Sequence, residues 1–231
     1  VHENLTESLE SKEWLLFPWA WRWALGGFDK LVAKFFDLIL AEKSYVEKYE
    51  KYKANYKVVL NLPDLEFFKP YQTDRENLSN DIFYIGGVSR DRCLFVVVEA
   101  LAILRKRGIP FHYHCIGPID EGLKRQLFED PNYLAIKDSL TIYGRLDGKE
   151  GYEISKKCRL GLSLMKPIGN YVTSYSTKVF EYMAIGLPVI TSNFDIYDDV
   201  VVKANCGLCV DPEDPIAIAD AIQKVLLDAN L

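Results

Sequence analysis

Short apolar stretches alternate with segments of helical periodicity from residue 82 to residue 227. The apolar stretches, which we expect to be strands, are 82–85, 111–116, 140–143, 160–165, 188–191 and 207–210. The expected helices are 93–107, 121–129, 151–158, a short helix that ends at Gly186, 199–204 and 215–227. Apolar strands separated by helices are typical of a parallel sheet that is buried on both faces. The chain is therefore predicted to be an α/β protein with a Rossmann-like parallel sheet and helices on both faces.

Three of the expected strands end in glycine. These glycines are Gly86 with Gly87, Gly117 and Gly144. In open α/β sheets, ligands bind at the carboxyl ends of the strands, where small residues let a ligand reach the backbone. The first of these turns continues to Arg90 and Arg92, whose guanidinium groups suit phosphate. Two interpretations of this turn stay open. It is either a phosphate-binding loop or an ordinary glycine turn whose arginines are solvated.

A second candidate site lies in residues 176–190, Ser-Thr-Lys-Val-Phe-Glu-Tyr-Met-Ala-Ile-Gly-Leu-Pro-Val-Ile. Lys178 falls in the first turn of the expected helix, and Glu181 lies one turn later. The amino end of a helix carries partial positive charge, so a lysine there makes sense if an anion is bound as well. The carboxylate would then face the group that carries the anion. A nucleotide, with its phosphates and ribose, satisfies both side chains.

Charge and composition restrict the partners of the chain. The net charge is −5, which argues against nucleic acid as a partner and leaves anionic small molecules possible. The five cysteines are scattered, which indicates a reducing compartment and hence the cytoplasm. No apolar run approaches the roughly 20 residues that a membrane span needs. We therefore expect a cytoplasmic protein.

The amino-terminal part differs in composition from the rest. It begins Val1-His2-Glu3, without Met or a signal peptide, and we interpret it as cut from a longer chain. All four tryptophans lie close together, as Trp14, Trp19, Trp21 and Trp23. Such a cluster beside basic residues suits peripheral contact with the inner face of a membrane. The interpretation that we favour over membrane contact is packing against a missing part of the chain, or covering an acceptor site.

A domain boundary is expected near Pro63. Residues 1–57 are predicted to be mainly helical, with a short buried strand at 37–41 and a second helix from Ser44. Pro63 turns the chain, and 69–80 is polar and rich in turn residues. We divide the chain into 1–62 and 63–231.

Four stretches together resemble a known family. They are 83–92, 176–190, 206–212 (Cys-Gly-Leu-Cys-Val-Asp-Pro) and 216–222 (Ile-Ala-Ile-Ala-Asp-Ala-Ile). Their order and spacing are similar to those of the donor-binding domain of retaining nucleotide-sugar glycosyltransferases of the GT-B type, called group 1 or family 4. The resemblance covers roughly residues 58–231. It implies that 63–231 is the donor-binding domain and that 1–62 is the end of the acceptor-side domain with the hinge.

The resemblance also implies roles for individual residues. Glu181 resembles the acid that accepts hydrogen bonds from the ribose, and Arg92 and Lys178 resemble the diphosphate contacts. The complete set implied for the nucleotide and its phosphates is Gly86, Gly87, Arg90, Arg92, Gly144, Arg145, Thr177, Lys178 and Glu181. The resemblance also implies contacts to the donor sugar from the loop that precedes the Lys178 helix, through Asn170, Tyr171 and Thr173. His2 resembles the histidine of the catalytic cleft.

The chain departs from the family pattern at three positions. Many members have Arg where Gly87 stands, so that phosphate contact is lost here or supplied by Arg90 or Lys178. Cys93 follows Arg92 where a Gly is usual. Thr173 replaces an acid that commonly contacts the sugar, which leaves the identity of the sugar open.

The resemblance implies a retaining hexosyltransferase that uses a nucleoside-diphosphate sugar and a glycan or lipid-linked acceptor, in bacterial polysaccharide or envelope biosynthesis. Neither a cofactor nor a metal is expected, because the resemblance implies that basic side chains and helix amino ends hold the diphosphate. We interpret the Cys206–Cys209 and His112–His114 pairs as structural rather than metal-binding. Two alternatives stay open: a nucleotide-sugar-binding module without turnover in this truncated form, and a sugar-nucleotide epimerase of the same architecture.

Overall fold

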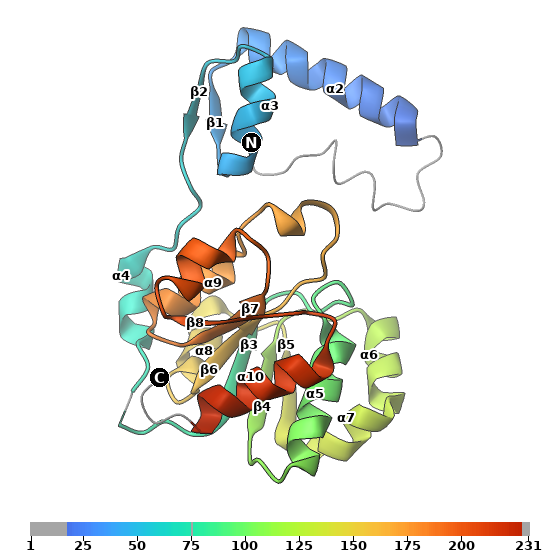
Figure 1. The fold of residues 1–231 in the computed structure, drawn as a ribbon, viewed down its shortest axis with the longest axis vertical. Helices are drawn as coiled ribbons and strands as arrows, with labels where there is room; N and C mark the ends of the chain where they lie inside the picture. Colours follow the sequence, from blue (N-terminus) through green and yellow to red (C-terminus); the bar gives the residue numbers. More distant parts are fainter. Residues whose placement is uncertain (1–17, 75, 228–231) are drawn as a thin grey trace. The chain divides into compact units, whose positions relative to one another are not determined.

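The computed structural model describes residues 18–74 and 76–227, and the chain divides into two compact units (Figure 1). The first unit consists of Val1–Leu62 and Pro167–Tyr175, and the second of Pro63–Lys166 and Ser176–Leu231. The structure thus groups the segment 167–175, which precedes the Lys178 helix, with the first unit. The assignment of the two units to acceptor and donor stays a prediction.

The first unit contains a small parallel βαβ motif. The motif consists of β1 (Leu38–Leu40), the helices η1 (Lys43–Tyr45) and α3 (Val46–Lys51), and β2 (Tyr56–Val58). The unit also contains α2 (Pro18–Phe35) and η4 (Gly169–Val172). The strand expected at 37–41 is present as β1. A second strand, β2, begins inside the region predicted to be mainly helical, because Tyr56 and Val58 pair with Leu38 and Leu40. Within the described residues, no helix has both the length and the hydropathy needed to cross a bilayer.

The second unit is built on a six-stranded sheet whose paired strands are all parallel, as predicted. The strands are β3 (Asp81–Ile85), β4 (His112–Ile116), β5 (Leu140–Gly144), β6 (Leu160–Ser163), β7 (Val189–Ser192) and β8 (Gly207–Val210). Their order is β5-β4-β3-β6-β7-β8. The chain therefore changes direction across the sheet between β3 and β6. A doubly wound sheet binds its ligands at such a switch point, beyond the carboxyl ends of the strands.

Helices connect and cover the strands. They are α4 (Leu65–Phe68), η2 (Lys69–Tyr71), α5 (Leu94–Lys106), α6 (Glu121–Glu129), α7 (Pro131–Ile136), η3 (Lys137–Ser139), α8 (Gly148–Ser155), α9 (Thr177–Ala184), the π-helix η5 (Asp198–Val202) and α10 (Pro215–Leu227). The sequence patterns did not predict α4 or α7. Both begin after a capping aspartate: Asp64 accepts from the backbone N–H of Glu66, and Asp130 accepts from two N–H groups of α7.

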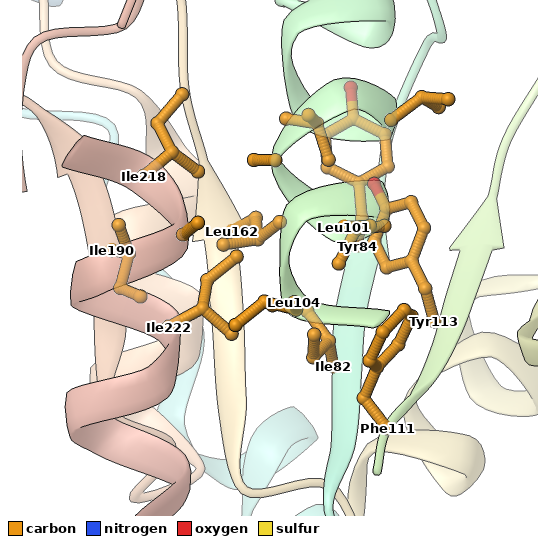
Figure 2. Close-up of a cluster of buried hydrophobic side chains, with 14 of the residues drawn as sticks. Ile82, Tyr84, Leu101, Leu104, Phe111, Tyr113, Leu162, Ile190, Ile218 and Ile222 are labelled. Carbon is orange, nitrogen blue, oxygen red and sulfur yellow. The ribbon is translucent and has the colours of Figure 1, made fainter. Parts of the chain in front are cut away.

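Alternate residues of each strand supply two cores. On one face, Ile82 and Leu162 pack with apolar residues of α5 and α10, including Leu101, Leu104 and Ile222 (Figure 2). On the other face, Phe83 contacts Tyr152 of α8 and Tyr182 of α9, with ring centroids 5.9 and 5.7 Å away. Helices therefore cover both faces of the sheet, which confirms the predicted fold class.

Tyr182 holds α9 against the sheet. It is fully buried; its hydroxyl accepts from the Ile85 N–H at 3.3 Å and donates to the Leu162 carbonyl at 3.3 Å. A Cβ on Gly161 would lie 2.5 Å from the ring of Tyr182. Only glycine at 161 leaves room for this tyrosine.

Substitution of Gly161 by alanine should therefore destabilise the protein. We expect Gly161→Ala to lower the free energy of unfolding by about 1–3 kcal/mol, the usual cost of overpacking, and the melting temperature by roughly 2–4 °C per kcal/mol. Gly27→Ala is the matched control, because no atom lies within 4 Å of the added Cβ in α2. An unchanged melting temperature in Gly161→Ala would contradict the close packing of Tyr182 on Gly161.

Candidate functional site

A row of glycines marks the carboxyl ends of three adjacent strands. Gly86, Gly117 and Gly144 follow or end β3, β4 and β5, with φ angles of 142°, 145° and 70°. A Cβ on Gly117 would lie 1.8 Å from the Gly86 carbonyl oxygen, so the two backbones are in direct contact. The Gly117 N–H donates to the Gly144 carbonyl at 2.7 Å. The strand ends therefore present backbone rather than side chains.

Lys178 lies against this backbone. It comes from the first turn of α9, which follows β6 and thus reaches the switch point beside β3. A Cβ on Gly86 would lie 2.5 Å from Lys178 Cε and 3.1 Å from its Nζ. The ammonium lies 5.7 Å from the centre of the Tyr84 ring. The structure thus brings Lys178 and Gly86, two predicted phosphate contacts, into contact.

Arg92 reaches the same place from the turn after β3. Its Nη1 donates to the Gly87 carbonyl at 3.1 Å and lies 3.5 Å from the position of a Cβ on Gly86. The Tyr84 hydroxyl donates to the same Gly87 carbonyl at 2.6 Å. Burial, and then the charge of Arg92, lower the pKa of Lys178 to about 8, although Glu181 opposes this. Among the described residues, neither cation forms an ion pair, so an anion bound here would stabilise both.

The carboxylate of Glu181 has a partner that the sequence did not reveal. The Tyr152 hydroxyl, from α8, donates to Glu181 Oε2 at 2.5 Å. Burial and the negative charge of Glu181 raise the pKa of Tyr152 well above its usual range. The sequence signal for Tyr152 is a single aromatic residue in a short, mainly polar helix.

Arg90 has local partners. It bonds to Gln126 Oε1 of α6 and lies 4.5 Å from the centre of the Phe95 ring. Its predicted phosphate contact thus stays a prediction, as do the base contacts of Gly144 and the exposed Arg145. Thr177 is the first residue of α9.

The predicted sugar contacts lie in the first unit, in or next to η4. The Asn170 carbonyl accepts from the backbone N–H of Thr173 at 3.2 Å and from its hydroxyl at 3.3 Å. Their role, and that of Tyr171, stays a prediction. His2 and Trp14 lie outside the described residues.

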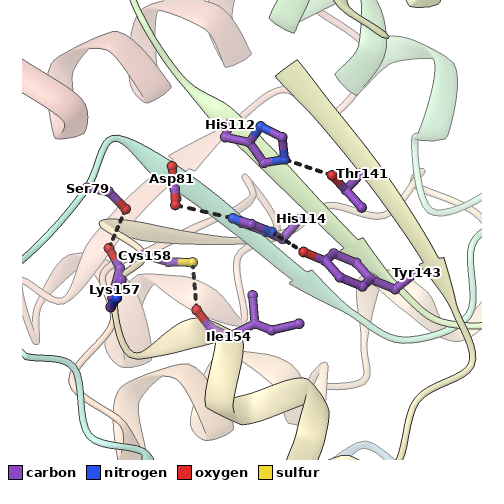
Figure 3. Close-up of polar contacts among 9 residues, drawn as sticks. All are labelled: Ser79, Asp81, His112, His114, Thr141, Tyr143, Ile154, Lys157 and Cys158. Atoms are coloured by element: carbon purple, nitrogen blue, oxygen red, sulfur yellow. Dashed lines mark hydrogen bonds and ion pairs between the residues drawn. The ribbon is translucent and has the colours of Figure 1, made fainter. Parts of the chain in front are cut away.

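The paired histidines form a separate polar cluster on β3, β4 and β5 (Figure 3). His114 bonds through Nδ1 to the Tyr143 hydroxyl at 2.8 Å and through Nε2 to Asp81 at 3.2 Å. His112 Nε2 bonds to the Thr141 hydroxyl at 2.8 Å. In the part of the chain that the structure describes, no three His, Cys, Asp or Glu side chains are placed to hold a metal ion. The cluster ties neighbouring strands together.

Comparison with known proteins identifies the family of the chain. The family model for glycosyl transferases group 1 matches residues 68–231. The chain belongs to this family. It is 24% identical over 183 residues to the capsular polysaccharide biosynthesis glycosyltransferase CapM of Staphylococcus aureus, covering 71% of this chain and 44% of CapM. It is 29% identical over 205 residues to a D-inositol 3-phosphate glycosyltransferase of Corynebacterium urealyticum, covering 81% and 47%.

Solved structures show the fold of this group 1 glycosyltransferase. Anabaena HepE in complex with UDP-glucose matches with a TM-score of 0.67 at 15% identity, over 87% of this chain and 57% of HepE. The fold is of the Rossmann-like GT-B type, as the resemblance implied. The chain spans about half the length of the curated relatives it matches.

The environment of Lys178 predicts a proton change on anion binding. At pH 8 about half of the Lys178 side chains are neutral, and a diphosphate beside them favours the charged form. We expect inorganic diphosphate to bind with net proton uptake, measured by calorimetric titration in two buffers of different ionisation enthalpy. Lys178→Met should remove this uptake, while Lys203→Met, at an exposed lysine paired with Asp199, should keep it. Equal uptake in wild type and Lys178→Met would exclude Lys178 as the titrating group.

Proposed function

We propose that this chain carries the donor site of a glycosyltransferase that moves a hexose from a nucleoside-diphosphate sugar to a glycan or lipid-linked acceptor, in bacterial polysaccharide or envelope biosynthesis. The observation that carries the proposal is the convergence of Lys178 and Arg92 on Gly86, with Glu181 one helical turn away. Two cations beside exposed backbone suit a diphosphate. A carboxylate near them suits the hydroxyls of the ribose.

The same groups give the site a chemical role. Departure of a nucleoside diphosphate leaves negative charge on the phosphate oxygens. Lys178, Arg92 and the amino end of α9 would stabilise that charge in the transition state. We propose that these groups hold the diphosphate without a metal ion. Retention at the anomeric carbon is part of the proposal, on the strength of the family resemblance, and contacts to the sugar are assigned to Asn170, Tyr171 and Thr173.

The relatives support the substrate class. HepE has been solved with UDP-glucose, and CapM is named for capsular polysaccharide biosynthesis. Because the chain spans about half the length of its relatives, donor binding is the part of the function that this chain can test by itself. The acceptor, and His2 as a residue of the catalytic cleft, belong to the proposal for the whole enzyme.

Donor binding predicts thermal stabilisation by one nucleoside diphosphate. We expect UDP, GDP or ADP to raise the melting temperature, with a gain of about 2.7 kcal/mol at a concentration one hundred times the dissociation constant. Arg92→Gln should weaken binding by about tenfold or more, because a charge-assisted hydrogen bond contributes about 1.5–3 kcal/mol. Glu181→Gln should weaken nucleotide binding and leave binding of inorganic diphosphate unchanged.

Arg107→Gln is the matched control. Arg107 follows α5 at its carboxyl end and pairs with Asp220 at 2.7 Å, away from the glycine row. Its loss should leave nucleotide affinity unchanged. If none of the three nucleotides stabilises the folded wild-type protein, the donor-site assignment is wrong.

We also propose that α2 makes peripheral contact with the inner face of the membrane. Trp21, Phe28, Leu31 and Phe35 are spaced by seven, three and four residues, which places them on one face of the helix, and each is more than half exposed. Trp23 is 83% exposed, and Lys30 and Lys34 are exposed on the same helix. An exposed apolar face with adjacent lysines suits an anionic lipid surface.

Vesicle binding tests this contact. We expect the protein to sediment with phosphatidylglycerol vesicles, and the double substitution Trp21→Ser with Phe28→Ser to weaken this by about tenfold or more. The control is Leu134→Ser with Ile216→Ser, which removes two exposed apolar side chains from the second unit. Equal loss in both variants, or no sedimentation of the wild type, would contradict a role for α2.

A further inference from the structure

The hydroxyl of Tyr152 is directed at the carboxylate to which we assign the ribose. It donates to Glu181 Oε2 at 2.5 Å. Tyr152 is 6% exposed, whereas Glu181 is partly exposed at the first turns of α9. One end of the contact is therefore fixed inside the protein, and the other end is accessible to a ligand.

The ring of Tyr152 is held by aromatic side chains from other elements. Phe68 of α4 meets it edge to face, with centroids 4.8 Å apart and planes at 89°. Phe83 of β3 lies 5.9 Å away, and Phe67 and Tyr71 lie 6.4 and 6.1 Å away. Such pairs are favourable beyond their burial. Tyr152 cannot turn away from Glu181 without opening this aromatic cluster.

We propose that Tyr152 is a positioning residue that orients Glu181 for the ribose hydroxyls and thereby makes the site selective for ribonucleotides; this rests on the proposed function. An ionised carboxylate has about four acceptor sites on its two oxygens. One bond from Tyr152 to Oε2 leaves Oε1 available to the ribose. A side chain oriented before the ligand arrives loses less conformational entropy on binding.

In the hydrogen bond between Tyr152 and Glu181, the tyrosine hydroxyl is always the donor. Burial and the neighbouring carboxylate raise the pKa of Tyr152 well above its usual range, so the hydroxyl stays protonated and remains the donor. Glu181 then remains the acceptor, both from Tyr152 and from a sugar hydroxyl. A deoxyribose lacks one of the hydroxyls that this oriented carboxylate would accept from, so the site should discriminate against it.

The test compares ribose recognition in the wild type and in Tyr152→Phe. The ligands are the best-binding of UDP, GDP and ADP, its 2′-deoxy and 3′-deoxy counterparts, and inorganic diphosphate, each titrated calorimetrically into the 231-residue chain. Tyr152→Phe should weaken the ribonucleotide by about tenfold, as expected for one hydrogen bond to a charged group. Binding of the deoxy counterparts and of inorganic diphosphate should change less than twofold, so the preference for ribose shrinks.

Tyr71→Phe is the matched control, because it removes a hydroxyl from the same aromatic cluster and should leave the ribose preference unchanged. Adding Tyr152→Phe to Glu181→Gln should have little further effect, since both act through one carboxylate. An unchanged ribose preference in Tyr152→Phe would overturn the positioning role. Equal weakening of all ligands would do so too, because it indicates a merely structural residue. A wild type that binds no nucleotide would instead refute the proposed function itself.

Discussion

The candidate site depends on the close approach of the Lys178 side chain to the backbone of Gly86. Any side chain at 86 would begin 2.5 Å from Lys178 Cε. Gly117 allows a second approach, because a Cβ there would lie 1.8 Å from the Gly86 carbonyl oxygen. Two missing side chains thus let a lysine from α9 cross the end of β3. Arg92 is placed beside it, and the repulsion between two cations is what a bound diphosphate would relieve.

The packing of Tyr182 of α9 against the sheet connects this site to the core. Tyr182 lies next to Glu181 in α9, and it is held between Gly161 and Phe83 on the sheet. Its hydroxyl bonds to the backbones of β3 and β6, the two strands that flank the switch point. Lys178 and Glu181 therefore keep their places relative to β3 because a fully buried neighbour fixes their helix.

Much of this fold follows from the sequence, because short, mainly apolar strands that alternate with helices leave few alternatives to a parallel sheet. The residue types at 178 and 92 were enough to predict that these two cations lie at one place, and the structure brings both to Gly86; an anion bound there stays a prediction. The contact of Tyr152 with Glu181 could not be read in this way, because it joins two helices across 29 residues. Arg90 was equally ambiguous, since its partner Gln126 lies 36 residues away. Likewise, α4 and α7 are too short for periodicity to show, and only their capping aspartates indicate them.

Cys93 shows that the turn after β3 is defined by its backbone conformation rather than by a glycine. Its φ is 60°, the left-handed region, and its N–H donates to the Arg90 carbonyl at 3.0 Å. That conformation costs a non-glycine residue about 1–2 kcal/mol, and the fully buried side chain offsets part of the cost. Burial also raises the pKa of the thiol to about 12, so it stays a neutral packing group. Cys93 thus adopts a backbone conformation that favours glycine, and Arg92, the preceding residue, reaches the Gly87 carbonyl.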